Sequence, residues 1–207
     1  MYRITEVVKQ LLILNVLLYL VTHWLMPQLG PALAMYYPAS DFFRPWQIVS
    51  HMFMHGNFQH LFFNMFALFM FGTALESYLG PKKFLTLYLL SGFGALALYL
   101  GVWYLEVSAL TPAQYQYFLT QPYRMVGASG AVFGLLAGYG MLFPESQIML
   151  LIPPIPIKAK YFVLIYAALE LYFGISATNP GVAHFAHVGG AIFGALIIFY
   201  WRKSGFR

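Results

Sequence analysis

Residues 127–134 read Gly127-Ala128-Ser129-Gly130-Ala131-Val132-Phe133-Gly134, a run of small residues that carries one serine and leads into an apolar segment. Glycine has no Cβ, so the spacing of Gly130, Gly134 and Gly138 predicts a helix face on which a second membrane helix packs almost in contact. A serine at the start of such a helix is open to close approach by a substrate backbone. Small-residue runs in membrane helices are more often packing surfaces than active sites, so the rest of the sequence has to decide between the two.

The composition around this run is that of a membrane protein. Hydrophobic residues make up 61% of the 207 residues and charged residues only 8%, whereas soluble domains carry about 25% charged residues. Uncharged runs of roughly 20 residues, the length that crosses a hydrocarbon core about 30 Å thick, recur along the chain. We therefore predict an all-α polytopic membrane protein in which residues 1–207 form a single transmembrane domain.

Composition also excludes several kinds of function. The sequence has no cysteine, which rules out disulfides, thiolate catalysis and thiolate metal sites. The formal net charge of +5 does not indicate nucleic-acid binding, because the basic residues lie in the turns between the apolar segments. The partner that the composition predicts is the lipid bilayer.

Glycine and proline divide the chain into six predicted spans. We expect them at residues 8–25, 58–78, 84–105, 126–143, 161–177 and 182–201. Ala32-Leu33-Ala34 resembles the cleavage site of a signal peptide. However, residues 26–34 form a long connector with two prolines, so we expect the first span to be retained. The connections at residues 26–57 and 106–125 are long and rich in aromatic residues, which is typical of segments at the membrane interface.

The basic residues predict the orientation of these spans. Nine of the eleven Lys and Arg residues fall at the two termini and in the second and fourth loops, and only Arg44 and Arg124 fall on the opposite side. The nine are Arg3, Lys9, Lys82, Lys83, Lys158, Lys160, Arg202, Lys203 and Arg207. The positive-inside rule then places both termini in the cytoplasm.

Three polar side chains from distant parts of the chain are expected at one depth in the membrane. His60, Ser129 and His187 lie near the starts of the second, fourth and sixth spans, and all three spans enter from the outer side. At 1.5 Å per residue, each side chain is expected roughly 5–10 Å below the outer surface. Polar groups inside a membrane are costly and usually functional, which makes a shared level informative.

The chemistry available at that level is nucleophilic catalysis. A serine hydroxyl becomes a good nucleophile when a base removes its proton, and His187 is the candidate base for Ser129. His60 and Asn64 are four residues apart, so they share a helical face from which both can donate hydrogen bonds to an oxyanion. Gly189, Gly190 and Gly194 follow His187 and predict a small face that packs against the fourth span.

Other interpretations of the same residues remain. Taken singly, a serine inside a membrane helix is more typical of helix packing, and a histidine near a helix end is more typical of the membrane interface. Asn64 alone is more typical of hydrogen bonding between helices. The histidines at 51, 55, 60, 184 and 187 could instead bind Zn²⁺ in a transporter or a metalloprotease. No acidic residue accompanies them in the sequence and no His-Glu-x-x-His motif occurs, so we predict no metal. A catalytically inactive protein that binds membrane clients is a further alternative.

The chain resembles the rhomboid intramembrane serine proteases. The resemblance rests on His60-Leu61-Phe62-Phe63-Asn64-Met65, Gly127-Ala128-Ser129-Gly130 and His187-Val188-Gly189-Gly190, with Glu76-Ser77-Tyr78-Leu79-Gly80 as a further similarity that is structural in the family. Nearly the whole chain is covered, and it looks like the basic six-helix form found in bacterial inner membranes.

This resemblance implies an endopeptidase that cuts single-pass membrane proteins near the outer end of their transmembrane helix. It implies a Ser129–His187 dyad without an acidic third member, an acyl-enzyme, no cofactor and no metal. His60, Asn64 and the backbone N–H of Ser129 would hold the oxyanion, with Gly127, Gly130 and Phe133 as neighbours of the site. The active site would open toward the outer side of the membrane.

Two positions, Gln47 and Phe133, differ from the residues usual in the family, and a third, Glu170, has no role in the implied dyad. Trp46 is followed by Gln47 where bacterial members usually have arginine, which leaves the anchoring of the first loop open. Phe133 stands where some members have a tyrosine that packs on the catalytic histidine, and its ring can still stack there. Glu170 is the one carboxylate deep within a span. We favour a structural, hydrogen-bonded role for Glu170 over orientation of His187, since the family does without an acid.

Overall fold

The computed structural model describes residues 4–150, 154–176 and 182–205. The predicted 179–181 turn, Pro153, Arg3 and Arg207 lie outside these residues. The longer helices are α1 (Glu6–Leu20), α4 (Phe58–Ala67), α5 (Thr73–Leu79), α6 (Pro81–Ser108), α7 (Pro112–Leu119), α8 (Ser129–Leu142), α9 (Ala159–Ser176) and α10 (His184–Lys203). Single π-helical turns extend α1 through Val21–Leu25 (η1) and join α4 to α5 through Leu68–Gly72 (η3). The predicted spans are thus present as helices, with shifted boundaries.

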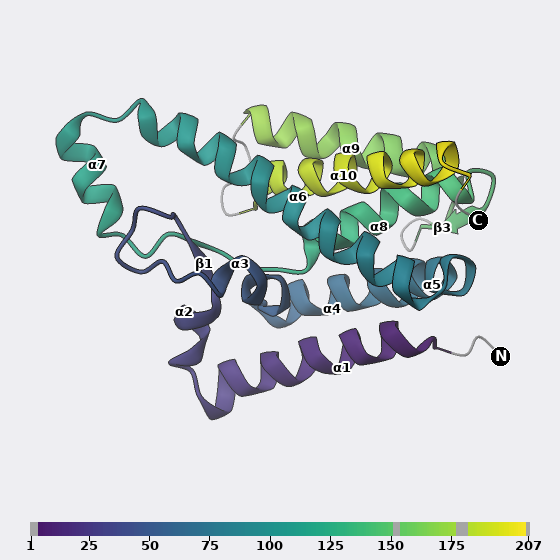
Figure 1. Cartoon of the computed structure of the whole chain (residues 1–207), viewed down its shortest axis with the longest axis horizontal. Coiled ribbons are helices and arrows are strands. Elements are labelled where there is room, and N and C mark those ends of the chain that lie inside the picture. The colour runs from purple at the N-terminus through teal and green to yellow at the C-terminus, as the bar shows by residue number, and fades with distance from the viewer. Residues whose placement is uncertain (1–3, 151–153, 177–181, 206–207) are drawn as a thin grey trace.

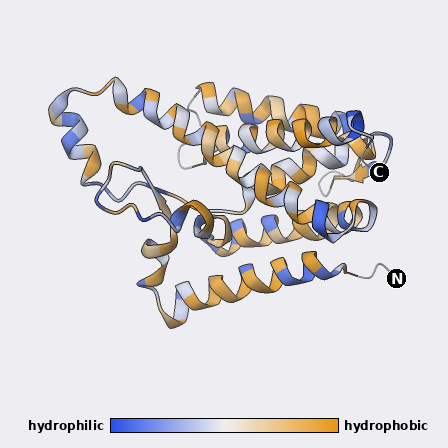
Figure 2. Cartoon of the chain, in the orientation of Figure 1, coloured by the Kyte–Doolittle hydropathy of each residue, from blue (hydrophilic) through white to orange (hydrophobic). Residues whose placement is uncertain are grey.

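Five helical segments in the described residues are long and apolar enough to cross a membrane. They are Glu6–Leu25, Phe58–Leu79, Pro81–Ser108, Ala159–Ser176 and His184–Lys203. Hydrophobic residues make up most of these helices, and hydrophilic residues are more frequent at the helix ends and on α7 (Figure 2). The chain is therefore a mostly helical, polytopic integral membrane protein.

The fourth predicted span is shorter than expected. Residues 126–143 were predicted to be helical, but α8 begins at Ser129 and has 14 residues, or about 21 Å at 1.5 Å per residue. The helix starts later because Arg124–Met125 (β2) pairs with Met35–Tyr36 (β1), and the three residues between β2 and α8 form a short connection in which Gly127 has a positive φ. The helix is almost entirely buried, with ten of its residues inaccessible. The apolar residues of α8 therefore serve mainly to pack against neighbouring helices.

Helix α8 packs between α6 and α10 with backbones in near contact. A Cβ built on Gly190 of α10 would lie 1.9 Å from the carbonyl oxygen of Gly130, and one on Gly194 would lie 2.4 Å from that of Gly134. On the other side, a Cβ on Gly130 would lie 2.4 Å from the Cβ of Ala95 in α6. The predicted packing of the small-residue faces of the fourth and sixth spans is thus confirmed.

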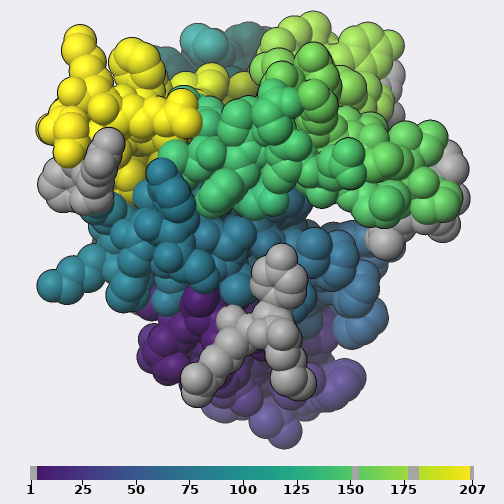
Figure 3. Space-filling view, turned by 90° about the vertical axis from the view of Figure 1, so that its right-hand side faces the viewer, coloured from purple at the N-terminus to yellow at the C-terminus, as the bar shows by residue number. Residues whose placement is uncertain are grey.

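The remaining helices surround this central packing. Figure 1 shows α1 along one side of the bundle and α9 along the other, with the starts of α4, α8 and α10 at the same end. The first turn of α1 and the last turn of α10 lie at the opposite end, which Figure 3 views directly: purple α1 at the bottom, green and yellow α8–α10 at the top. Glu76 of α5 holds α1 in place, because its carboxylate accepts hydrogen bonds from the backbone N–H groups of Val7 (3.0 Å) and Val8 (2.9 Å). A carboxylate suits the positive end of a helix dipole, which fits the structural role implied for this motif.

Two short antiparallel pairings correct the all-α prediction. Strand β1 pairs with β2, and Gln147–Met149 (β3) pairs with Pro156–Lys158 (β4). Each pair fixes a connection between helices. The second pairing closes the hairpin between α8 and α9, while the first ties the loop after α1 to the residues that precede Ser129.

Gln47 anchors the first loop, at the position where the family usually has arginine. The loop contains short helices at Leu29–Leu33 (α2) and Gln47–Ser50 (α3), then a 3₁₀ turn at His51–Phe53 (η2). The buried Gln47 amide donates to the carbonyls of Phe42 (3.1 Å) and Ala32 (3.3 Å), and its oxygen accepts from the backbone N–H of Arg44 (3.0 Å). The indole of Trp46 donates to the same Ala32 carbonyl at 2.9 Å. These bonds settle the anchoring that the sequence left open.

Replacing Gln47 by alanine is expected to lower the stability of the protein by about 2–4 kcal/mol, since buried backbone groups lose their partners. Thermal unfolding in detergent measures this as a fall in the midpoint of several degrees. Gln10→Ala is the matched control, because the Gln10 amide is exposed and donates to the exposed Glu6 carboxylate at 3.1 Å. Equal midpoints for the two variants would show that Gln47 does not anchor the loop.

Candidate active site

Ser129 is the first residue of α8 because the chain before it is held from two sides. Strand β2 fixes residues 124–125, and the backbone N–H of Gly127 donates to the carbonyl of His51 at 2.9 Å. Gly127 has φ +135°, a conformation that disfavours any side chain, and a Cβ there would lie 2.8 Å from the His60 ring. Glycine at 127 therefore lets the loop pass beneath His60 and present the Ser129 side chain.

Ser129 and His187 lie within hydrogen-bond distance. The Oγ of Ser129 is 2.9 Å from Nε2 of His187, although the two residues are 58 positions apart in sequence. This distance falls in the range expected for a nucleophile and its base, about 2.6–3.2 Å. His187 is buried and Ser129 half-buried, so the contact lies just inside the protein surface. The predicted hydrogen bond between the two side chains is confirmed.

Phe133 fixes the plane of the His187 ring. It lies one turn after Ser129 on α8, and its ring stacks on His187 with centroids 4.3 Å apart and planes 5° from parallel. The stacking expected at this position therefore does not need the hydroxyl of a tyrosine. Gly190 of α10 lets this helix approach α8 closely near this contact, while Gly130, next to Ser129, makes room for Ala95 of α6.

His60 and Asn64 lie on α4, with His60 beside the Ser129 loop. The His60 ring packs over Gly127, and the position that a Gly127 Cβ would occupy is 2.9 Å from His60 Nε2 and 3.4 Å from Ser129 Oγ. Asn57 caps α4 by accepting from the backbone N–H of His60 at 2.8 Å. One N–H of the buried Asn64 amide is used locally, since it donates to the carbonyl of His60 at 2.9 Å. The structure thus brings His60 to the Ser129 loop, with Asn64 one turn further along the same helix.

Glu170 contacts His187, the candidate base, which was the less favoured of the two roles considered from the sequence. Its Oε2 atom is 2.8 Å from Nδ1 of His187 and 2.7 Å from Nδ1 of His184. The hydrogen-bonded, buried position expected for Glu170 is confirmed, but one of its two partners is His187, whose orientation was the less favoured role. The only sequence signal was a lone carboxylate deep in an apolar segment, which indicates a special role without naming its partners.

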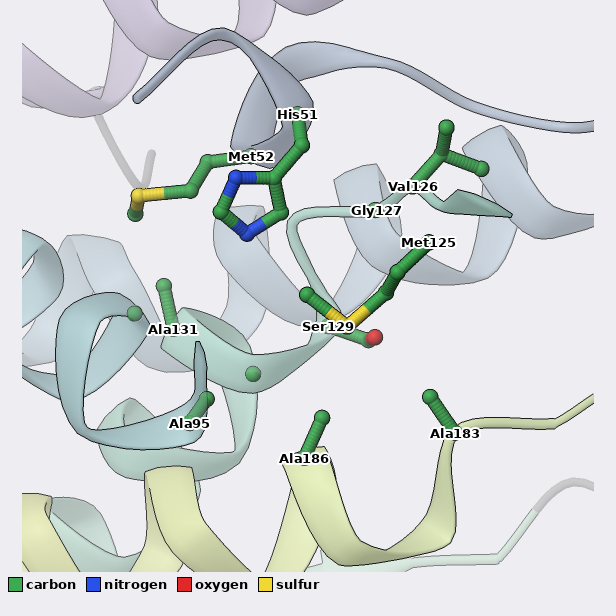
Figure 4. A pocket seen from close by; sticks show the side chains of 12 residues that line it. His51, Met52, Ala95, Met125, Val126, Gly127, Ser129, Ala131, Ala183 and Ala186 are labelled. Atoms are coloured by element: carbon green, nitrogen blue, oxygen red, sulfur yellow. The ribbon is translucent and has the colours of Figure 1, made fainter. Parts of the chain in front are cut away.

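A small cavity lies beside Ser129. It has a volume of about 10 Å³, roughly the space of one water molecule. Figure 4 shows the His51 ring pointing toward it from the loop, with Ala95 of α6 and Ala186 of α10 on the other side. The space is therefore large enough for one water molecule beside Ser129.

The histidines proposed as an alternative metal site do not form one cluster. His51 is tied to the first loop through its Nδ1 and the carbonyl of Gln47, at 2.7 Å. The ring of His55 packs edge-on against His60 with centroids 5.1 Å apart. Within the described residues, the group with metal-like spacing is Glu170, His184 and His187, whose ligand atoms lie within 4.8 Å of one another. Contrary to the prediction from the sequence, an acidic residue, Glu170, does lie beside two of the histidines, His184 and His187.

Acidification is expected to destabilise the protein through His51 and His55. Burial lowers the pKa of His51 to about 4 and that of His55 to about 3. Both values lie below that of an unfolded histidine, so the unfolded chain binds more protons below about pH 6.5. Stability is therefore complete above that pH and falls as the pH drops, with a slope approaching about 1.4 kcal/mol per pH unit for each group.

Thermal midpoints measured in detergent between pH 7.5 and 5 test this expectation. The midpoint should fall on acidification, and His55→Gln should reduce the slope. A midpoint that does not change over this range would contradict the buried, neutral state of both rings.

Comparison with known proteins places the chain in a family. Residues 43–204 match the model of the Rhomboid domain. The chain is 34% identical over 158 residues to "Rhomboid protein 1, mitochondrial" of Saccharomyces cerevisiae, covering 76% of this chain and 42% of that protein. It is 35% identical over 158 residues to "Rhomboid protease AarA" of Providencia stuartii, covering 73% and 54%. It is 30% identical over 150 residues to "Rhomboid protease GluP" of Bacillus subtilis, covering 72% and 24%.

The chain thus spans between a quarter and about half of the length of these relatives. The matched region contains every residue of the site described above, from His51 to His187. The family model matches more than half of the chain, and relatives at least 30% identical match more than two thirds of it: the chain belongs to the rhomboid family.

Proposed function

We propose that this protein is an intramembrane serine endopeptidase in which Ser129 is the nucleophile and His187 the general base. The observation that carries the proposal is the 2.9 Å contact between Ser129 Oγ and His187 Nε2, made by the first residue of α8 and the first turn of α10. Relatives named as rhomboid proteases add weight to it.

The reaction follows from this geometry. The Oγ of Ser129 bonds to the carbonyl carbon of the scissile peptide while its proton passes to Nε2 of His187. The carbon–nitrogen bond then breaks, and the same proton moves to the leaving amine, which produces an acyl-enzyme. A water molecule, deprotonated by His187, attacks the ester and releases Ser129.

Stabilisation of the oxyanion is assigned to three donors. These are the backbone N–H of Ser129, the ring of His60 and the free N–H of the Asn64 amide. The first N–H groups of α8 have no partner within the helix and carry the positive end of its dipole, which favours a negative charge there. Gly127 and Gly130 allow the close approaches around Ser129, and Phe133 holds His187. No metal or other cofactor has a part in these steps.

The substrates proposed are single-pass membrane proteins, cut near the outer end of their transmembrane helix. We assign six spans to residues 1–207 as one domain, with the 14-residue α8 as the fourth. Both termini are placed in the cytoplasm of a bacterial inner membrane, because most basic residues belong to elements at one end of the bundle (Figure 1). They include Lys82 and Lys83 at the start of α6, Lys158 in the β3–β4 hairpin, and Arg202 and Lys203 at the end of α10. Ser129 lies at the other end and opens toward the outer side.

Proteolysis in liposomes tests the proposal. The protein is reconstituted with a panel of tagged transmembrane segments that carry glycine or proline in their outer third, and the products are mapped by mass spectrometry. We expect cuts in the outer third that disappear with Ser129→Ala. Cuts that persist in this variant, or that fall only in soluble segments, would overturn the proposal.

A further inference from the structure

Glu170 is an unusual residue for helix α9. Only Ala159 and Glu170 of this helix are buried, while most of its apolar side chains face outward. A carboxylate is expensive to bury in a membrane protein unless charged or polar groups compensate it. The groups that do so here are the rings of His184 and His187, both in the first turn of α10.

These contacts determine where the histidine protons lie. An ionised carboxylate can only accept hydrogen bonds, and a single oxygen of Glu170 faces Nδ1 of both rings, at 2.7 and 2.8 Å. Both Nδ1 atoms therefore carry a proton. A neutral imidazole with a proton on Nδ1 has a free lone pair on Nε2. For His187 this is the atom that lies 2.9 Å from Ser129 Oγ, so the ring is in the tautomer that can accept the serine proton.

We propose that Glu170 is a positioning residue of the active site, which fixes the tautomer and orientation of His187 and stabilises its charged form. This inference rests on the proposed function of Ser129 and His187 and deepens it. It turns the expected two-residue arrangement into a Ser129–His187–Glu170 chain, with His184 as a second donor that holds the carboxylate in place. When Nε2 of His187 takes the serine proton, the Nδ1 proton stays in its bond to Glu170, and the new positive charge lies beside a negative one.

Phe133 and Glu170 constrain the His187 ring in different ways: Phe133 restricts its tilt, and Glu170 selects its tautomer. The stacked Phe133 restricts tilting of the His187 plane but cannot choose between two tautomers that have the same shape. Only a hydrogen-bond acceptor at Nδ1 makes that choice. Glu170 is the residue that supplies it, at 2.8 Å.

Glu76 offers a matched control, since it is also a buried carboxylate that accepts two hydrogen bonds. Its partners are the backbone N–H groups of Val7 and Val8, so its role is to hold helix α1. Loss of charge at either position removes a buried acceptor and is expected to reduce stability. Only the loss at Glu170 is expected to change the chemistry of His187.

The first arm of the test compares rates of labelling by a fluorophosphonate probe for the wild type, Glu170→Gln and Glu76→Gln in detergent. An amide at position 170 carries no negative charge, so it stabilises the charged form of His187 less than the carboxylate does. Its NH₂ group can also turn toward the rings in place of the oxygen, and that orientation favours the tautomer with the proton on Nε2. In a soluble serine protease, an asparagine in place of the tautomer-fixing acid costs about 10⁴-fold. We expect a smaller fall here, about 10²-fold, for Glu170→Gln, and a rate within a few-fold of wild type for Glu76→Gln.

The second arm reads the tautomer directly, from ¹⁵N chemical shifts of labelled histidine in the full-length protein. We expect His187 of the wild type to carry its proton on Nδ1, and Glu170→Gln to move protons to Nε2. A wild-type His187 protonated on Nε2 would overturn the inference even if Glu170→Gln fails to fold. An unchanged labelling rate in folded Glu170→Gln would overturn it as well.

Two further outcomes are distinguished by the same experiments. Loss of labelling after treatment of the wild type with EDTA would contradict the inference, because Glu170, His184 and His187 would then act as metal ligands. A wild type that is folded but not labelled would instead contradict the proposed function. Labelling that depends on Ser129 and His187 but not on Glu170 would leave that function standing and remove only the role of the carboxylate.

Discussion

Replacement of Gly190 by alanine is expected to prevent assembly of the bundle and to abolish every reaction of Ser129. The added Cβ would lie 1.9 Å from the carbonyl oxygen of Gly130 and 2.7 Å from its carbonyl carbon. Both atoms belong to the backbone, so α8 and α10 would have to move apart by about 1 Å at a point where protein interiors have no spare room. Ser129 and His187 lie within three residues of the two clashing positions, so their hydrogen bond would be lost too.

The yield of monodisperse protein on size exclusion, the thermal midpoint and probe labelling measure this effect. Gly101→Ala is the matched control, because a Cβ on this glycine of α6 meets no atom within 4 Å among the described residues. Alanine is favoured over glycine inside a helix by about 1 kcal/mol, so this variant should be as stable as wild type or more so. Wild-type midpoints and labelling in Gly190→Ala would refute the close packing of α8 and α10.

Replacement of His187 by alanine is expected to slow the reaction of Ser129 with a fluorophosphonate by about 10⁴-fold or more. The hydroxyl would lose the imidazole ring that lies 2.9 Å away, in position to remove its proton. The substitution would also remove the ring that stacks on Phe133, and it would leave Glu170 with one hydrogen-bond donor, His184, instead of two. The rate constant of labelling, followed by in-gel fluorescence, measures the loss.

His23→Ala controls for the removal of a histidine as such. His23 lies in η1, where its ring stacks on Tyr19 with centroids 3.9 Å apart, and among the described residues its hydrogen bonds go to Tyr19 and Thr22 of the same helical segment. We expect this variant to be labelled at nearly the wild-type rate. If His187→Ala were also labelled at that rate, another base would have to activate Ser129.

The pairing of Ser129 with His187 could be predicted from the sequence for physical reasons. A polar side chain in an apolar segment stands out, and helical rise gives its depth from its distance to the segment end. The flanking glycines indicated which helices come into close contact, and Gly130–Gly190 is indeed the tightest approach between α8 and α10. Depth and close contact together were sufficient to bring the serine and the base together.

The contact between Glu170 and the histidines could not be predicted in the same way. Its depth was evident, but an apolar helix such as α9 has no polar stripe that says which way a single carboxylate faces. The rotation of α9 follows from its packing against α8 and α10, for example the contact of Gly140 with Val163. Packing of this kind depends on the shapes of many side chains at once and leaves no short pattern in the sequence.

The start of α8 and the anchoring of the first loop were missed for another reason. Both depend on backbone hydrogen bonds between distant segments, namely the β1–β2 pairing and the bond from Gly127 to His51. Gln47 occupies a family arginine position but reaches neighbouring carbonyls through its amide. A comparison of residue types shows that such a substitution exists, whereas only the structure shows what replaces the lost interactions.

The assignment of Ser129 as the nucleophile is tested directly by identifying the serine that reacts with a fluorophosphonate. The wild-type protein is treated with a fluorophosphonate, digested, and analysed by mass spectrometry to locate the adduct. We expect a single modified residue, Ser129, in a protein whose thermal midpoint shows that it is folded. An adduct on a different serine, or a folded protein that carries no adduct, would contradict the assignment of Ser129 as an activated nucleophile.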